Sequence, residues 1–345
     1  MPGLSFFALS LVSVQERCSY PVMMEQVVRN EEDKAAAKAK KATKAKKKTA
    51  KTKKGAAQQS KQKPGRPKGS KNQDKTQVKL TSELGLIKSM IQKLLLIING
   101  VMPLTYLVLD GQFGTNNALQ MTLQCGLKLI SKLRYDAALY FPYRGPRNKN
   151  GPPRKYGDRL DYDNIPERYL KADFVEDDIR TRVYQVMMLH KEFAQPLNVV
   201  VILKTNLKTQ SRAHAVLFSS DLDLAYDLLI DYYALRFQIE FDFRDAKQYW
   251  GLEDFMNIKQ APVTNAANLS LFMVNVSRLL LRQLRKLKPH AGVLDLKAHF
   301  HGCRYVAETL NLLPVFPDPI LLNHVFDAVS QLGSIHPFEP CSDPP

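Results

Sequence analysis

Residues 106–114 read Tyr-Leu-Val-Leu-Asp-Gly-Gln-Phe-Gly, a short apolar run that ends on Asp110 and is followed by two glycines. The run has the length and composition of a buried strand, and the glycines predict a tight turn after it. A helix is expected over residues 116–125 and another strand over 127–133. Strand, helix and strand in this order predict an α/β fold, with Asp110 emerging where a strand ends.

The sequence upstream of this run divides into structured and unstructured parts. Residues 4–14 and 20–28 have the composition of two strands, and residues 80–98 carry apolar residues at helical spacing. Between them, residues 31–79 consist mainly of Lys, Ala, Gln, Gly and Pro, without an aromatic residue. This segment has too little apolar surface to offset the entropy lost on ordering, so we expect a disordered linker.

The positive charge of the chain is concentrated in this linker. The net charge is +17, and residues 34–72 contain 16 of the 50 Lys and Arg and no acidic residue. Such a segment indicates nucleic-acid binding. Its sequence Lys63-Pro-Gly-Arg-Pro-Lys68 resembles the core of an AT-hook, which predicts that Arg66 and Lys68 enter an A·T-rich minor groove. A nonspecific polycation is the alternative.

The remaining composition indicates a cytoplasmic protein without a membrane segment. The four cysteines form no C-x-x-C pair and fit reduced thiols better than a disulfide framework. The longest apolar run, residues 4–14, is too short to cross a bilayer and lacks the features of a signal peptide.

The second half of the chain predicts a β-rich insertion followed by helices. The expected insertion, residues 141–219, contains three strand-like runs, at residues 182–189, 198–204 and 213–218. Helical patterns cover residues 220–250 and 265–288. We expect residues 220–290 to form a helical part of the core and residues 291–345, which are rich in proline, to form a loose tail.

The expected helix over residues 220–250 carries the most specific pattern, Y-x2-R-x3-E-x6-K. Its members are Tyr233, Arg236, Glu240 and Lys247. On one continuous helix these side chains fall within a stripe about 60° wide. A carboxylate flanked by Arg, Lys and Tyr suits a site that holds a metal ion and grips a phosphate, whereas ordinary Arg–Glu pairing on a surface helix is the alternative. Three further residues are expected to face solvent: Gln238, Asp242 and Asp245.

A role for Asp110 as a metal ligand is indicated only when it is considered together with Glu240. By itself, an aspartate after a strand is more often a turn residue or a helix cap. Two-metal phosphoryl transfer, however, needs carboxylates from different elements around ions about 3.5–4 Å apart. We therefore take Asp110 and Glu240 as the candidate catalytic residues and metal ligands.

The run ending on Asp110, the β insertion and the Y-x2-R-x3-E-x6-K pattern together resemble the bacterial insertion-sequence DDE transposases that bear the YREK signature. The resemblance covers about residues 4–313. It implies an RNase H-like core with a β insertion, Mg²⁺- or Mn²⁺-dependent cleavage of insertion-sequence ends, and strand transfer into target DNA. It also implies that Tyr233, Arg236 and Lys247 contact end phosphates, and that a homodimer associated with the nucleoid acts on the double-stranded DNA.

The chain departs from the family at its beginning. An RNase H-like core carries its first metal-binding aspartate on the first of three hairpin strands, yet only two strands, within residues 1–30, precede the continuation of the core at residues 80–140. No upstream aspartate lies in an apolar run, and Glu25 is the nearest substitute. We therefore expect an N-terminally truncated transposase with crippled two-ion binding. The alternatives are a noncatalytic DNA-binding remnant, or inhibitor of the full-length transposase, and a nucleic-acid-coating protein that depends on the basic segment alone.

The β insertion begins with a loop in which basic and aromatic residues alternate. The basic residues are Arg144, Arg147, Lys149, Arg154 and Lys155, and the aromatic residues are Tyr140, Phe141, Tyr143 and Tyr156. A DNA-facing loop and a merely solvated loop are both consistent with this composition.

Overall fold

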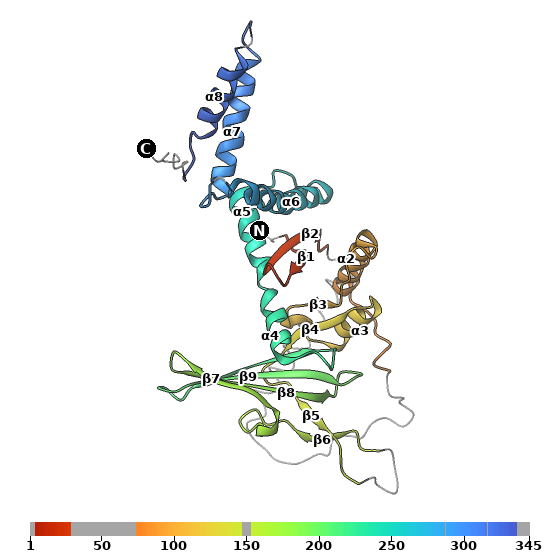
Figure 1. Cartoon of the computed structure of the whole chain (residues 1–345). Coiled ribbons are helices and arrows are strands. Elements are labelled where there is room, and N and C mark those ends of the chain that lie inside the picture. Colours follow the sequence, from red (N-terminus) through yellow and green to blue (C-terminus); the bar gives the residue numbers. More distant parts are fainter. Residues whose placement is uncertain (1–3, 29–73, 147–152, 287, 316, 337–345) are drawn as a thin grey trace, which may run out of the picture. The chain divides into compact units, whose positions relative to one another are not determined.

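The computed structural model describes residues 4–28, 74–146, 153–286, 288–315 and 317–336. Arg66, Lys68 and most of the predicted linker lie outside the described residues. The chain divides into two compact units (Figure 1). Unit 1 comprises Met1–Phe7 and Gln26–Phe237, and unit 2 comprises Ala8–Glu25 and Gln238–Pro345.

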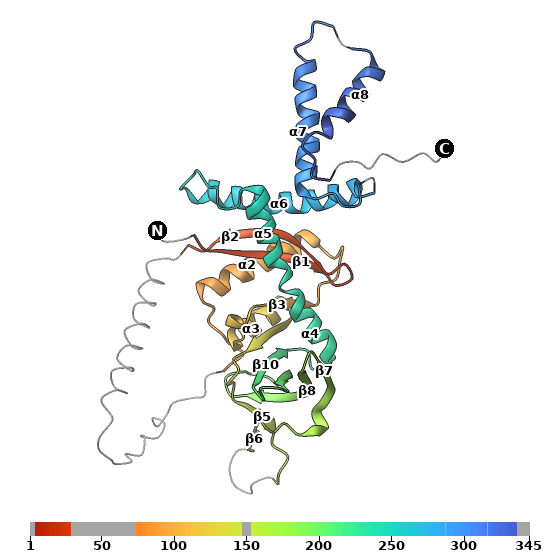
Figure 2. The same ribbon diagram turned by 90° about the vertical axis from the view of Figure 1, so that its left-hand side faces the viewer.

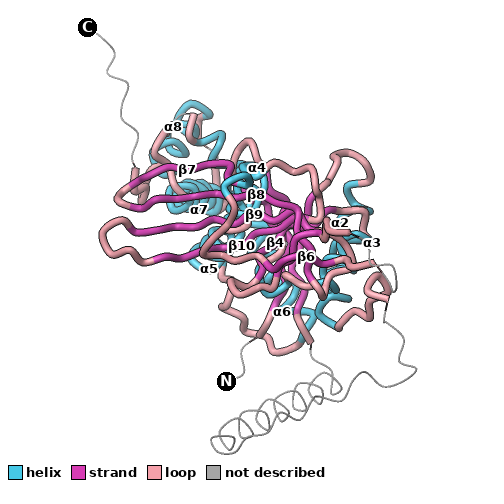
Figure 3. Tube along the Cα trace, turned by 90° about the horizontal axis from the view of Figure 1, so that it is seen from below, coloured by secondary structure: helices cyan, strands magenta, loops and turns pink. Residues whose placement is uncertain are grey.

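Unit 1 is built on an eight-stranded mixed sheet, which confirms the predicted α/β class. The strands are β3 (Tyr106–Val108), β4 (Lys128–Leu133), β5 (Leu139–Pro142), β6 (Tyr156–Arg159), β7 (Leu170–Glu176), β8 (Ile179–His190), β9 (Leu197–Asn206) and β10 (Arg212–Ser219). Their order is β3-β4-β10-β9-β8-β5-β6, with β7 also paired to β8. Figure 3 shows the central strands β8, β9, β10 and β4 of this sheet. Strands β3 and β4 are parallel, and the other pairs are antiparallel. Among the described strands, β3 pairs only with β4, so β3 and β6 are opposite edges of this order.

Helices cover both faces of this sheet. They are α2 (Ser82–Ile98), α3 (Asn116–Gln124) and α4 (Tyr226–Leu235), with short 3₁₀ turns η1 (Gly111–Phe113) and η2 (Glu167–Tyr169). Val199 and Val201 of β9 pack in one core with α2 and α3, whereas Val200 packs in a second core with α4. Because side chains alternate along a strand, an apolar run such as β9 is buried on both faces. The sheet therefore lies between two layers of helix.

The ends of α2 follow ordinary capping chemistry. The Thr81 hydroxyl accepts a hydrogen bond from the backbone N–H of Leu84 at the start of the helix. Asn99, with φ of 39°, ends the helix in the left-handed region that short polar residues tolerate. The predicted helix over residues 80–98 is confirmed within two residues at its start.

The two N-terminal strands form a separate hairpin, β1 (Phe6–Ser13) with β2 (Cys18–Gln26) (Figure 2). Both strands were predicted, at residues 4–14 and 20–28. Most of the hairpin belongs to unit 2. There, the backbone of β2 accepts hydrogen bonds from three side chains, those of Asn268, Asn275 and Arg278.

In addition to the hairpin residues, the described part of unit 2 contains four helices. They are α5 (Gln238–Trp250), α6 (Gln260–Leu284), α7 (Val293–Leu310) and α8 (Pro319–Ser330). Helices α7 and α8 lie side by side (Figure 1), and a β-carbon added to Gly302 would lie 2.6 Å from the carbonyl oxygen of Val329. The prediction of a loose tail after residue 291 is therefore wrong for residues 293–330. Among the described residues after 291, Pro314 and Pro317 lie between the two helices and Pro319 is at the first position of α8, where proline is compatible with a helix.

The segment after α8 is attached to α7 through the buried carboxylate of Asp295. That carboxylate accepts hydrogen bonds from the backbone N–H groups of Gly292, Ile335 and His336, at 2.6–3.0 Å, and contacts the imidazole Nδ1 of His336 at 2.9 Å. Burial alone would raise the pKa of Asp295, but these hydrogen bonds hold the pKa well below its usual range. None of the described helices is both long and apolar enough to cross a lipid bilayer.

Candidate functional site

Asp110 lies two residues after the last residue of β3, close to the strand end that the sequence predicted, and it is exposed. One carboxylate oxygen accepts a hydrogen bond of 2.8 Å from the backbone N–H of Gly111, at the start of η1. The Ser131 hydroxyl of β4 donates to the Asp110 carbonyl oxygen at 3.1 Å. The backbone of Asp110 is thus held by the neighbouring strand while its carboxylate remains accessible.

The glycines after Asp110 allow the turn to lie against β4. A β-carbon added to Gly114 would lie 2.3 Å from the carbonyl oxygen of Lys132, too close for any side chain. A β-carbon added to Gly111 would lie 3.4 Å from Cβ of Lys132. The φ of Gly114 is −68°, so the requirement is for space and not for an unusual backbone conformation. Lys132, which the sequence did not single out, thereby brings an exposed cation beside the turn.

Tyr233 and Arg236 lie at the end of α4, in the same unit as Asp110. The guanidinium carbon of Arg236 is 5.8 Å from the centroid of the Tyr233 ring. Burial raises the pKa of Tyr233; the Arg236 guanidinium opposes this rise, and the negative charge of Asp110 adds to it. The three residues therefore share one electrostatic environment in which the phenol stays protonated at neutral pH.

The prediction of one continuous helix over residues 220–250 is wrong. Helix α4 ends at Leu235, and α5 begins at Gln238. The backbone N–H groups of Arg236 and Phe237 donate to carbonyl oxygens three residues earlier, on Tyr233 and Ala234, which tightens the chain at this point. The Y-x2-R-x3-E-x6-K pattern therefore does not form a stripe on one helix: its first two members belong to unit 1 and its last two to unit 2.

Glu240 and Lys247 lie in the first and last turns of α5, and both are exposed. Seven residues apart, they are about 20° from one another around the helix and share one side of it. The Lys247 ammonium forms an ion pair with Glu253, a partner that the sequence pattern did not indicate.

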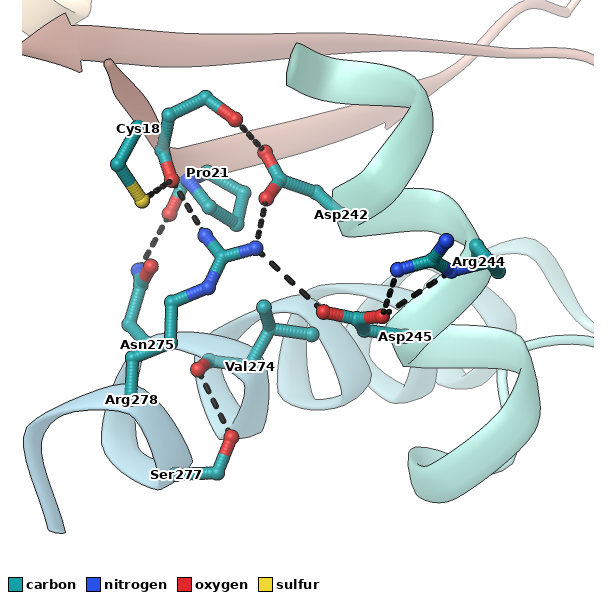
Figure 4. Close-up of polar contacts among 10 residues, drawn as sticks. Cys18, Pro21, Asp242, Arg244, Asp245, Val274, Asn275, Ser277 and Arg278 are labelled. Atoms are coloured by element: carbon teal, nitrogen blue, oxygen red, sulfur yellow. Dashed lines mark hydrogen bonds and ion pairs between the residues drawn. The ribbon is translucent and has the colours of Figure 1, made fainter. Parts of the chain in front are cut away.

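The opposite side of α5 is held in unit 2 by Asp242. We expected Asp242 to face solvent, but it is fully buried, and Asp245 is only 23% exposed. The Asp242 carboxylate forms an ion pair of 2.7 Å with Arg278 of α6 and accepts a hydrogen bond from the Ser19 hydroxyl of β2 (Figure 4). Arg278 also donates to the Ser19 carbonyl oxygen and lies 3.5 Å from Asp245. Asp242 is about 200° from Glu240 around the helix, so its burial directs Glu240 outward.

Helix α6 also occupies the edge of β2 through two asparagines. The Asn268 side chain accepts a hydrogen bond of 2.8 Å from the backbone N–H of Met24 and donates one of 2.8 Å to the Met24 carbonyl oxygen. Asn275 donates to the Pro21 carbonyl oxygen at 2.7 Å. These side chains bond to an edge that would otherwise expose its backbone groups.

The candidate metal ligands do not form a complete donor set within the described residues. No three His, Cys, Asp or Glu side chains there are grouped so that they could hold a metal ion. Asp110 belongs to unit 1, whereas Glu240 belongs to unit 2. Each unit therefore holds one of the two candidate metal ligands, and both candidates, Asp110 and Glu240, are exposed carboxylates of the kind that Mg²⁺ or Mn²⁺ binds.

Sequence comparison assigns the chain to a family. A family model described as DDE superfamily endonuclease matches residues 1–189, which include Asp110 and the strands on either side of it but not the residues of α4 and α5. No curated protein matches the chain. The mixed sheet with helices on both faces agrees with the RNase H-like fold of DDE nucleases. The match covers more than half of the chain, and the chain belongs to the DDE superfamily endonucleases.

Proposed function

We propose that this chain is a DDE-type DNA transposase that acts on insertion-sequence ends, by cleavage and by strand transfer into target DNA. The observation that supports it best is the position of Asp110. In a chain of the DDE endonuclease family, an accessible carboxylate follows β3 on a turn with no room for a β-carbon at Gly114, and its charge acts on Tyr233, which lies beside Arg236. Asp110 and Glu240 are proposed as ligands of Mg²⁺ or Mn²⁺.

The other members of the Y-x2-R-x3-E-x6-K pattern have proposed roles that follow from their chemistry. The planar guanidinium of Arg236 can donate two parallel hydrogen bonds to the nonbridging oxygens of a DNA phosphate. Tyr233, held protonated, can donate a third hydrogen bond from its phenol. Lys247 is proposed to exchange its exposed ion pair with Glu253 for a phosphate, which is feasible because surface ion pairs contribute little, about 0–1 kcal/mol.

The test is metal-dependent nicking of supercoiled plasmid DNA by the purified chain, with Asp110→Asn, Glu240→Gln and the control Asp136→Asn. Asp136 is an exposed acid of unit 1 that pairs with Arg134. We expect the wild type and Asp136→Asn to nick DNA with Mg²⁺ or Mn²⁺ at a low rate, because the described residues bring no three metal-ligating side chains together. Asp110→Asn and Glu240→Gln are expected to fall to background while still binding DNA. Equal nicking by all four proteins would contradict the assignment of Asp110 and Glu240.

A second candidate function is that of a noncatalytic DNA-binding protein that inhibits an active transposase. It is favoured by the observation that the described residues bring no three metal-ligating side chains together. In this case the wild type would bind DNA and nick none with either metal. Addition of this chain to an active transposase of the same element would then lower the rate of that enzyme.

Two further features are proposed with the function. We infer that two copies of the chain act together on double-stranded DNA, and that the protein works in the cytoplasm, associated with the nucleoid. Light scattering of the protein with and without duplex DNA measures the mass of the complex, and hence the number of chains in it. A mass of one chain in the DNA complex would contradict it.

A further inference from the structure

Several cations of unit 1 pair with carboxylates, as in Arg134–Asp136, Arg180–Asp173, Arg182–Glu167 and Lys208–Asp178. Cations also lie over single tyrosine rings, at Arg168, Arg182 and Arg236. On the β5–β6 hairpin and beside it, three cation–tyrosine pairs are gathered. The pairs are Lys191–Tyr140 at 4.6 Å, Arg154–Tyr143 at 4.7 Å and Lys155–Tyr156 at 6.0 Å, measured to the ring centroids.

Four of these residues form one continuous row. The rings of Tyr140 and Tyr156 contact each other edge to face, with centroids 5.6 Å apart, and one ammonium group lies over each ring. We call Lys191, Tyr140, Tyr156 and Lys155 the tyrosine–lysine row. Both lysines are exposed, and both tyrosines are partly exposed.

The row keeps its positive charge. Two exposed acids, Asp158 and Glu192, are close in sequence, but among the described residues neither Lys155 nor Lys191 has a carboxylate within 4.0 Å. A ring attracts a cation through its quadrupole and orients it without neutralising its charge, at about 0.5–1 kcal/mol for an exposed pair. The ammonium groups are thus positioned and still free to bind an anion.

A third cation adjoins the row. The Lys75 ammonium donates a hydrogen bond of 2.5 Å to the carbonyl oxygen of Lys191 and is exposed. Three cations that bind no described carboxylate therefore gather where β5 and β6 meet the segment after β8. A line of such cations with tyrosines between them matches the phosphate backbone of DNA, which carries regularly spaced negative charges.

The row lies far along the sheet from Asp110. In the strand order of unit 1, β3, which leads to Asp110, is one edge and β6 is the other. We propose that the tyrosine–lysine row binds the phosphate backbone of double-stranded DNA as a contact separate from the site at Asp110. This inference rests on the proposed DNA-acting function and adds a second DNA surface to it.

The test is the salt dependence of binding by the full chain to a random-sequence DNA duplex, in EDTA, so that the result is independent of catalysis. Each lysine that contacts a phosphate contributes about 1 to the slope of log K against log salt concentration. We expect the double variant Lys155→Ala/Lys191→Ala to lower this slope by about 2, and Lys155→Arg/Lys191→Arg to keep it.

The matched control removes two exposed lysines elsewhere in unit 1, as Lys204→Ala/Lys208→Ala. It should leave the slope unchanged. If the chain binds the duplex and both alanine pairs give the wild-type slope, the row is not a DNA contact, whereas the proposed function stands. If the wild-type chain binds no DNA at any salt concentration, both proposals are overturned.

Discussion

The Asp242 carboxylate and the Arg278 guanidinium form an ion pair of 2.7 Å within unit 2, and the carboxylate is fully buried. Burial raises the pKa of Asp242, while the Ser19 hydroxyl and the Arg278 guanidinium act in the opposite direction. The pair joins α5 to α6 and to β2, and so sets which side of α5 presents Glu240 and Lys247. Four properties of the chain can be tested from this and related contacts.

Asp242→Asn is expected to lower the free energy of unfolding by about 2–3 kcal/mol. Removing one partner of a buried ion pair leaves the other charge uncompensated, and here Arg278 is still 22% exposed and near Asp245, which moderates the loss. Urea denaturation followed by circular dichroism measures the change. Asp254→Asn, an exposed acid of the same unit, should change the value by less than about 0.5 kcal/mol, and a similar effect of both variants would contradict the role of the pair.

Gly114→Ala is expected to destabilise the protein by about 1–3 kcal/mol, because the added carbon would force the turn after Asp110 away from Lys132. Nicking activity should fall with it, since Asp110 would be displaced. The control is Gly85→Ala inside α2, where no atom lies within 4 Å of the added carbon. There alanine should stabilise the helix by about 0.5–1 kcal/mol. Thermal denaturation of both variants checks the opposite signs.

Asn268→Ala is expected to lower the stability of unit 2 by about 1–3 kcal/mol, because the backbone N–H and carbonyl of Met24 both lose their side-chain partner. Hydrogen exchange of the Met24 amide should become faster. Asn265→Ala, one turn earlier on α6 and exposed, serves as the control. Unchanged exchange at Met24 in the Asn268 variant would show that the edge of β2 is protected in another way.

Low pH is expected to lower the free energy of unfolding of unit 2, because Asp295 becomes protonated. Because the folded-state pKa of Asp295 is lowered, its stabilising effect is fully present above the pKa of the unfolded chain, near 4, and is lost as the pH falls below that value. Asp295→Asn should cost about 2 kcal/mol at pH 7 and remove part of the loss between pH 5 and pH 3. Urea denaturation across this range measures both effects, and parallel curves for variant and wild type would refute the assignment.

Much of the local structure followed from the sequence. The apolar run before Asp110 predicted β3, the helical spacing after Thr81 predicted α2, and the runs at residues 182–189, 198–204 and 213–218 predicted β8, β9 and β10. These elements depend on nearby residues, through side-chain alternation and capping, so a single chain carries the information for them. The α/β class and the position of Asp110 at the end of a strand followed for the same reason.

Other features depend on partners that are distant in the sequence. Asp242 had the spacing of a solvent-facing residue, yet Arg278 and Ser19, the latter 223 residues away, bury it. The chain tightens at Arg236 and Phe237 although the helical pattern continues through them, and α7 and α8 pair where proline content had indicated a loose tail.

The sequence alone determined that this chain has an α/β core with an aspartate at the end of a strand, because the hydrophobic pattern that specifies a strand is local. The burial of Asp242, the close approach of Gly114 to Lys132, and the positions of Lys155 and Lys191 over tyrosine rings became visible in the folded chain. Whether a charged or small residue is exposed, paired or closely packed depends on the free energy of its contacts with residues that are distant in the sequence. The spacing of residues along the chain does not specify those contacts.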